Sequence, residues 1–323
     1  MSKSLENNYP LSVSNETPVF RKRTSKKVKI IKTLKPYFYL LPAILLLGIW
    51  IYKPLVSTFI LAFESWGMVP GTTPEPVGLE NFVRLFNNKD FLTSILNTIF
   101  YTVGLFPFSI IIPLLLAVVT HGMMGKIKTV YRVIFFIPMI LAPVTVSAIW
   151  RWLFQPSTGL INIALIKMGL IHKNISFFSD PHFAKWVILF VTGWGLIGFS
   201  TIMFSAALTS VNQDYYEAAS LDGSGKFKQF FDITLPLLSP TIFFMITMSI
   251  LFSSQFTFAY IDILTSGGPF GSSTNIYYEM YKDGFSDLNV GLSSAAAALF
   301  FCVFAIIALV LNYVSRKFAF YDN

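Results

Sequence analysis

Six long apolar stretches run through the sequence, separated by shorter polar segments. A bilayer core of about 30 Å requires about 20 apolar residues of helix, and each stretch reaches that length with few charged side chains inside it. The pattern predicts an all-α polytopic membrane protein with a single membrane domain at residues 36–323, preceded by a basic, largely disordered tail at residues 1–35. The expected transmembrane helices are Tyr37–Ile60, Ile95–Val119, Val130–Trp150, Trp186–Leu208, Thr241–Ile263 and Leu292–Tyr313.

Prolines and glycines interrupt several of these expected helices. Pro138 and Pro143 lie inside the third, and packing against neighbouring helices can accommodate them. In the fourth, Gly193, Gly195 and Gly198 would permit close contact between helices.

The second half of the fifth expected helix is unusually polar for a lipid environment, so it should face the bundle interior or a water-filled path. Its hydroxyl, amide and aromatic side chains suit a sugar, as does the mid-membrane Trp194. The same side chains could instead bond or pack helices together, and both interpretations stay open. The candidate path residues are Trp194, Ser253, Gln255, Phe256, Thr257 and Tyr260.

Composition agrees with a protein that folds in lipid, because 54% of the residues are hydrophobic and only 12% are charged. Cys302 is the single cysteine and lies in an apolar stretch, so an intrachain disulfide and a cysteine-based metal site are excluded. The three histidines are scattered over connecting segments. We expect neither a metal nor a cofactor.

The net charge of +8 is concentrated before the first apolar stretch, where nine of the 24 Lys and Arg precede Pro36. Such a cluster marks the cytoplasmic side and attracts anionic lipid, so nucleic acid is not an expected partner. With six spans, 16 Lys and Arg fall on that side and 8 on the other. Both termini are therefore expected in the cytoplasm.

A charged island at Asp214–Pro236 separates the fourth and fifth apolar stretches, on the expected cytoplasmic side. Asp214 and Glu217 have the spacing of a capping box, Gly223 should end the first helix, and phenylalanines at helical spacing predict a second. This pattern fits a hairpin lying on the membrane surface and, equally, a helix that docks into a partner protein.

The island resembles a known motif. Glu217-Ala218-Ala219, three residues, Gly223, nine residues and then Ile233-Thr234-Leu235-Pro236 is similar to the EAA motif of ABC importer permeases. Gly223-Ser224 departs mildly from the commoner Gly-Ala pair. Features elsewhere resemble the carbohydrate-type permeases, relatives of the maltose and glycerol-3-phosphate proteins, although the first outer loop is too short for the extra domain of the maltose-type subunit. Those features are Asn97-Thr98, Arg132, Pro138, Trp150, Leu221-Asp222-Gly223 and Leu264–Pro269.

This resemblance implies a type I ABC importer permease fold and a permease subunit that forms half of the path for a sugar or sugar-like solute. Residues 212–236 would be the coupling segment, with Glu217, Ala218, Ala219, Asp222 and Gly223 docking into an ATPase. The implied partners are a second homologous permease subunit, two cytoplasmic ATPase subunits that hydrolyse ATP, and an extracytoplasmic solute-binding protein. The chain itself would not be catalytic.

Three alternatives remain open. A permease of the same superfamily could carry a solute other than a carbohydrate. A membrane-embedded transferase would need a constellation of Asp, Glu or His at a membrane boundary, and the acids outside the motif are dispersed. A channel or secondary transporter is disfavoured because the fourth and sixth apolar stretches contain no charged residue.

Overall fold

The computed structural model describes residues 26–68, 71–123 and 125–319, in two compact units that divide between Leu55 and Val56. Residues 1–25 of the expected tail lie outside the described residues. The first unit contains α1 (Lys26–Leu47), the π-helical turn η1 (Gly48–Tyr52) and the start of α2 (Lys53–Leu61). Helix α1 thus begins within the basic cluster, ahead of the expected span.

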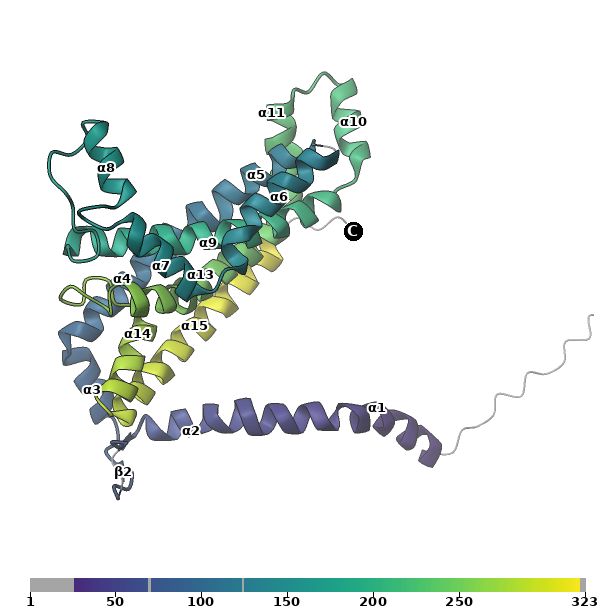
Figure 1. Ribbon diagram of the computed structural model, residues 1–323. Helices are drawn as coiled ribbons and strands as arrows, with labels where there is room; N and C mark the ends of the chain where they lie inside the picture. The colour runs from purple at the N-terminus through teal and green to yellow at the C-terminus, as the bar shows by residue number, and fades with distance from the viewer. Residues whose placement is uncertain (1–25, 69–70, 124, 320–323) are drawn as a thin grey trace, which may run out of the picture. The chain divides into compact units, whose positions relative to one another are not determined.

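The second unit is a helical bundle with one short antiparallel hairpin, in which β1 (Glu64–Ser65) pairs with β2 (Glu75–Pro76). Its helices lie in the order shown in Figure 1. They are α3 (Glu80–Asn87), α4 (Lys89–Phe106), η2 (Pro107–Ile111), α5 (Ile112–His121), α6 (Gly125–Ile140), α7 (Pro143–Leu153), α8 (Leu160–Lys167), α9 (Pro181–Thr209), α10 (Gln213–Leu221), α11 (Lys226–Gln229), η3 (Phe230–Thr234), α12 (Leu235–Leu237), α13 (Ser239–Leu264), α14 (Ile276–Tyr281), η4 (Lys282–Ser286) and α15 (Val290–Phe318).

Five helical segments in the described part of the chain are long and apolar enough to cross a membrane, and a bent pair makes a sixth. The prediction of six spans is therefore confirmed, with one correction. The third span is not a single helix, because Val133–Ile140 and Pro143–Leu153 meet at 105°. Pro143 begins α7 and disfavours helical backbone at the preceding Ala142, which has ψ of 139°. The five continuous segments are Tyr37–Leu61, Lys89–His121, Pro181–Thr209, Ser239–Leu264 and Val290–Phe318.

Three of the four π-helical turns in the described residues end two positions before a proline. A proline in a regular helix lacks a donor and its ring clashes with the carbonyl four residues earlier. A widened turn moves that carbonyl aside, so the helix continues instead of breaking. These turns end at Tyr52, Ile111 and Thr234, and the prolines are Pro54, Pro113 and Pro236.

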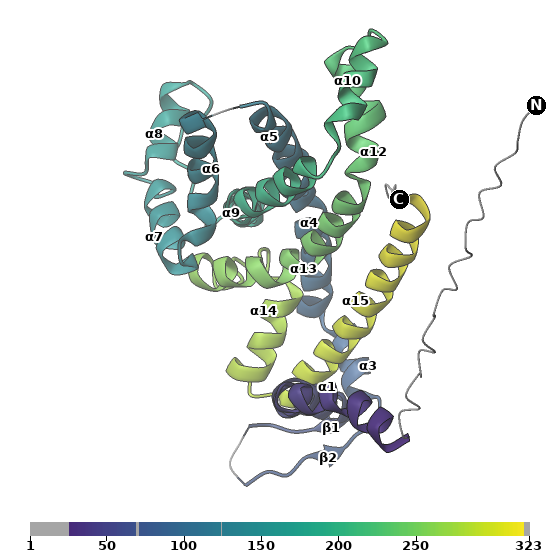
Figure 2. The ribbon, with the colours of Figure 1, turned by 90° about the vertical axis from the view of Figure 1, so that its right-hand side faces the viewer.

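Helix α9 lies in the middle of the second unit and packs against α4, α5, α6 and α13 (Figures 1 and 2). Glycines allow these close approaches. A Cβ on Gly198 would lie 2.3 Å from the carbonyl oxygen of Phe135, and one on Gly193 would lie 2.4 Å from the ring of Phe108. Both glycines therefore serve the packing that the sequence predicted, whereas Gly195 faces only the Tyr260 hydroxyl at an ordinary 3.6 Å.

Candidate functional site

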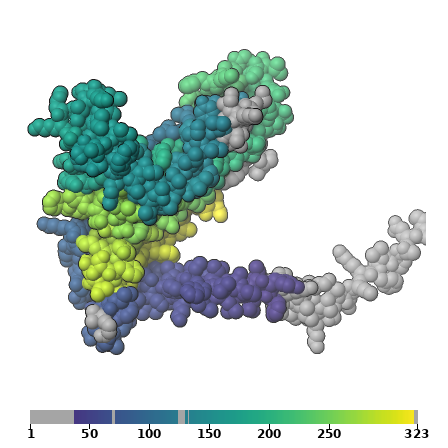
Figure 3. Space-filling model, viewed as in Figure 1, coloured from purple at the N-terminus to yellow at the C-terminus, as the bar shows by residue number. Residues whose placement is uncertain are grey.

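A polar hairpin connects α9 to α13 in the sequence and projects from one end of the bundle. It consists of α10, a glycine turn, α11 and η3, and it occupies the position of the charged island predicted from the sequence. The space-filling view shows it standing out as the green projection at the upper right (Figure 3).

The two ends of α10 are defined by local backbone chemistry. The side chain of Asn212 accepts a hydrogen bond from the amide of Asp214 at 3.1 Å, which makes Asn212 the N-cap. The predicted capping box starting at Asp214 is therefore wrong, because asparagine two residues earlier is itself a strong cap. At the other end Gly223 has φ of +76°, and the amide of Ser224 donates to the carbonyl of Ala219 at 2.9 Å. This left-handed glycine ends the helix, as the sequence predicted.

The predicted coupling residues share the exposed side of the hairpin. Glu217, Ala218, Asp222 and Gly223 are exposed, and Ala219 is half-buried. The structure thus brings all five together on one short helix and its turn. A carboxylate and a small-residue surface are presented there without protein covering them.

An open groove of about 580 Å³ lies beside α10. It separates the hairpin from the end of α5, where His121 and Val118 contribute to its wall. Glu217 and Lys226 place opposite charges on its wall, which also carries the apolar side chains of Leu221 and Phe230. The residues of α10 and of the following segment that line it are Gln213, Tyr216, Glu217, Ser220, Leu221, Lys226, Gln229, Phe230 and Thr234.

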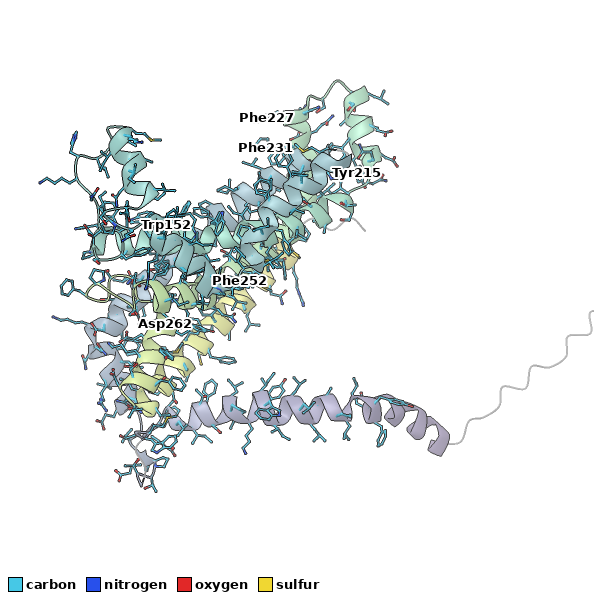
Figure 4. The ribbon with its side chains drawn as sticks, in the orientation of Figure 1. Trp152, Tyr215, Phe227, Phe231, Phe252 and Asp262 are labelled. Carbon is cyan, nitrogen blue, oxygen red and sulfur yellow. The ribbon has the colours of Figure 1, made fainter. Side chains whose placement is uncertain are left out.

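Large apolar side chains at this end of the molecule were not predicted as site residues. Leu221 is 90% exposed and Phe227 is 80% exposed. Figure 4 shows Phe227 and Phe231 on one arm of the hairpin and Tyr215 on the other. The sequence feature that could have identified Leu221 is an apolar residue at the end of a charged helix that lies outside the apolar stretches. Exposed groups of this kind mark interaction surfaces.

Two of the predicted path residues on α13 are buried inside the subunit. Ser253 and Thr257 are fully buried. The Ser253 hydroxyl lies 2.7 Å from the hydroxyl of Thr102 on α4, and Thr257 accepts a hydrogen bond of 2.7 Å from the amide of Asn275. Their hydrogen bonds join α13 to its neighbours, as in the helix-bonding interpretation that the sequence left open.

Other predicted path residues meet at the break between α6 and α7. Phe256 and Tyr260 line a cavity of about 110 Å³, together with Thr192 and Gly195 of α9. The Thr192 hydroxyl is buried and lacks a hydrogen-bond partner among the described residues. The remaining wall comes from the broken helix itself, at Pro138, Met139, Leu141 and Pro143.

The last two predicted path residues lie nearby on the same helices. Trp194 packs edge-to-face against Trp150, with ring centroids 5.5 Å apart. The indole nitrogen of Trp150 is buried and has no partner among the described residues. Gln255 is exposed on α13.

A second charged segment, the return segment (α14 and η4, residues 276–286), follows the other end of α13. Glu279 and Asp283 are buried at 3% and 4% exposure. The pKa of Asp283 is raised to about 7, mainly by burial and then by the neighbouring Glu279 and Asp287, while Lys282 lowers it. Burial also raises the pKa of Glu279. Lys282 lies 3.8 Å from Glu279 and 3.6 Å from Asp90.

These features define a class of protein, namely a multi-pass helical membrane protein with a broken span beside its central helix and a polar hairpin exposed at one end. Within that class the family is shown by sequence. A family model described as binding-protein-dependent transport system inner membrane component matches residues 81–319. The chain belongs to this family, so it is the membrane component of a transport system that works with a binding protein.

Similar proteins carry permease names. The chain is 30% identical to the sn-glycerol-3-phosphate transport system permease protein UgpA of Pectobacterium atrosepticum over 87% of this chain and 94% of the relative. It is 28% identical to the protein of that name from Shigella flexneri over 94% and 99%.

A solved bacterial ABC transporter involved in the import of the acidic polysaccharide alginate is similar in structure, with a TM-score of 0.78 and 27% identity over 90% of this chain and 98% of that chain. A second solved structure, a bacterial alginate ABC transporter in complex with an alginate pentasaccharide-bound periplasmic protein, matches this chain with a TM-score of 0.77. The predicted permease fold and the predicted membership of the importer permeases are confirmed. Because the family consists of transport components, the prediction of a non-catalytic chain is confirmed with them.

Proposed function

We propose that this chain is one of two permease subunits in an ATP-driven importer for a sugar or sugar-like solute, and that α10 is the helix through which an ATPase drives it. The observation that carries this proposal is the placement of Glu217 and Leu221, both exposed on a short capped helix that lies outside the apolar bundle. The hairpin that holds them connects directly to α9 and α13. A force applied to α10 therefore reaches two membrane-spanning helices.

Charge supports the proposed orientation of this surface. The hairpin lies on the side of the membrane that holds 16 of the 24 Lys and Arg in the six-span topology. That side is the cytoplasm, where ATP and an ATPase subunit are available. Both termini then lie in the cytoplasm, and the return segment lies on the outer face with the binding protein.

Two kinds of contact are proposed for the ATPase interface. The Glu217 carboxylate would accept hydrogen bonds from a cation or from backbone amides in a cleft of the partner, while Ala218 and Ala219 keep the helix thin enough to enter it. Leu221 would supply apolar area, which its 90% exposure makes available. Asp222 and Gly223 form the turn that presents these side chains.

For the solute path we propose the region beside the helix break. Phe256, Tyr260 and Trp194 offer aromatic faces there, and the buried Thr192 hydroxyl is a polar group still available for a hydrogen bond. Interrupted helices near buried polar groups are typical of transporter binding sites. Ser253 and Thr257, at helical spacing with Tyr260, would support this path through their bonds to Thr102 of α4 and to Asn275. Gln255, which is exposed, would face the second permease subunit.

The names of the relatives support the solute class. They concern a glycerol phosphate and an acidic polysaccharide, so hydroxyl-rich solutes, including negatively charged ones, are the first to test. Uptake should be measured in proteoliposomes that contain the complete transporter, supplied with binding protein and ATP, across neutral sugars, sugar phosphates, polyol phosphates and oligosaccharides. The carbohydrate assignment would be overturned if no solute that contains a sugar or polyol is taken up while a solute without either shows saturable uptake.

The coupling role is tested by Glu217→Lys in the same system. We expect uptake to fall by at least about tenfold, because the reversed charge opposes docking, while the amount of chain in the membrane stays constant. Glu75→Lys is the matched control, since Glu75 is exposed in the β1–β2 hairpin outside the proposed interface. Uptake by Glu217→Lys equal to that of the control would refute the docking role. Purification of the tagged wild-type chain should also yield a second permease chain and an ATPase.

A further inference from the structure

Four residues of the hairpin form a closed circuit of hydrogen bonds. The Tyr216 hydroxyl lies 3.0 Å from the Thr234 hydroxyl, and the Thr234 hydroxyl donates to the backbone carbonyl of Gln229 at 3.4 Å. The Gln229 side-chain amide donates to the Ser220 hydroxyl at 2.9 Å, and that hydroxyl donates to the backbone carbonyl of Tyr216 at 2.7 Å. The circuit begins and ends at Tyr216.

The direction of each bond in this circuit is determined by the available protons. Because Thr234 uses its proton on the Gln229 carbonyl, Tyr216 must be the donor to Thr234. Ser220 likewise uses its proton on the Tyr216 carbonyl and accepts from Gln229. The second amide proton of Gln229 goes to the carbonyl of Ser224 at 3.0 Å. The hydroxyls of Thr234 and Ser220 therefore each donate once and accept once, and the Tyr216 hydroxyl donates to Thr234, so the network links the two arms of the hairpin.

The circuit joins α10 to the one buried residue of η3. Thr234 is 5% exposed and stands at the end of the π-helical turn that precedes Pro236. In a widened turn the register of backbone bonds shifts, and the Thr234 hydroxyl bonds the carbonyl of Gln229, five residues earlier. Pro236 thus accounts for the turn, and the turn places a threonine hydroxyl where the Tyr216 hydroxyl reaches it.

Packing alone holds α10 weakly. None of its residues is buried, and in the described part of the chain no other element makes more than sparse backbone contact with it. The hydrogen-bond circuit is a non-covalent link between α10 and the turn that leads into α13.

We propose that Tyr216, Ser220, Gln229 and Thr234 are positioning residues that join the docking helix rigidly to the start of α13. This inference rests on the proposed coupling function of α10. With the circuit intact, displacement of α10 moves η3 and α12 and so the start of α13, whose far half carries Phe256 and Tyr260. With the circuit open, α10 pivots on its exposed connections and the displacement is lost before it reaches the membrane.

The test uses hydroxyl deletions in the complete transporter reconstituted with ATPase and binding protein. Tyr216→Phe removes one bond and Thr234→Val removes two, both with the shape of the side chain kept, whereas Thr234→Ser keeps the hydroxyl. We expect the number of solute molecules taken up per ATP hydrolysed to fall roughly three- to tenfold in both deletions, and Thr234→Ser to retain the wild-type ratio. Thr247→Val is the matched control, because the Thr247 hydroxyl donates to the Phe243 carbonyl of its own helix, α13.

The double variant decides whether the two hydroxyls act as one unit. Because each single deletion already breaks the circuit, Tyr216→Phe with Thr234→Val should lower the ratio no further than either alone. A wild-type ratio in Thr234→Val, or multiplied effects in the double variant, would overturn the proposal. Hydrogen exchange of the backbone amides, measured on the same samples, separates this failure from a failure of the coupling function. If α10 exchanges faster in Thr234→Val but Glu217→Lys keeps full uptake, the circuit holds α10 in place and coupling through α10 is refuted. If exchange in α10 is unchanged in Thr234→Val, the positioning role of the circuit is refuted.

Discussion

The α10–η3 hairpin and the return segment are both charged, and they flank opposite ends of α13, but the chain treats their charges in opposite ways. The hairpin leaves Glu217 and Asp222 in solvent. The return segment buries Glu279 and Asp283, and both ion pairs found among the described residues involve its Lys282. Glu279 has an intramolecular partner in Lys282, whereas the exposed Glu217 and Asp222 are accessible to another chain.

Apolar side chains differ less sharply. At the hairpin Leu221 and Phe227 are 90% and 80% exposed, while in the return segment Ile276 is buried within a core cluster formed with α15 and Phe285 is 65% exposed. Each segment has a helix that a side chain caps, Asn212 for α10 and Asn275 for α14. Local helix chemistry is therefore shared, and what distinguishes the two segments is whether tertiary contacts cover them.

The largest effect that would sharpen this comparison is expected at the hairpin tip. Leu221→Asp should lower coupled uptake by about tenfold or more, because a carboxylate replaces apolar area at the proposed docking surface. Thermal stability of the isolated chain should stay unchanged, since Leu221 is 90% exposed. Leu170→Asp, at a side chain that is 67% exposed in the connection after α8, serves as the control. If both variants transport normally, the apolar tip is not an interface.

At the other end of α13 the expected effect is on stability. The amide nitrogen of Asn275 donates to the Ser254 carbonyl at 2.9 Å and to the Thr257 hydroxyl at 2.7 Å, and its oxygen accepts from the Tyr278 amide at 2.8 Å. Asn275→Ala leaves these buried groups without partners and should cost about 1–3 kcal/mol. Thermal unfolding in detergent measures this loss. The exposed Gln255→Ala should change stability by less than about 0.5 kcal/mol, and an equal loss there would contradict the assignment.

A third expected effect is the pH dependence of stability that the return segment contributes. The folded-state pKa of Asp283 is about 7 against an ordinary value of 3.8, so between these two values the folded chain holds a proton that the unfolded chain has lost. Stability should therefore fall as pH rises from about 4 to about 7. Asp283→Asn should weaken this dependence and raise the melting temperature at pH 8.

The control for this effect is Asp180→Asn, at the half-buried N-cap of α9, where asparagine also caps. It should leave the pH profile unchanged. A profile for Asp283→Asn that matches the wild type would mean that Asp283 does not carry the dependence.

Much of the fold followed from linear pattern. The apolar stretches predicted six spans, and Gly223 predicted the end of α10, because length, hydropathy and a left-handed glycine act locally. The third span was predicted as one helix and is bent, since Pro143 can kink a helix or break it and only packing decides which. The predicted capping box at Asp214 was wrong because Asn212, a second candidate cap, lies two residues earlier.

In the candidate site, too, some features are local to one segment and others depend on tertiary contacts. By itself the sequence determined that a charged hairpin must lie outside the lipid and that α13 carries hydroxyl and aromatic side chains, because both are properties of residues within one segment. Only the tertiary structure decided which of those side chains are used internally. Ser253 and Thr257 find partners on α4 and in the loop before α14, Phe256 and Tyr260 line the cavity at the break, and Tyr216 meets Thr234 across the hairpin. Such pairings depend on how helices cross, and the partner of a hydroxyl 18 or 151 residues away is not encoded in its neighbours.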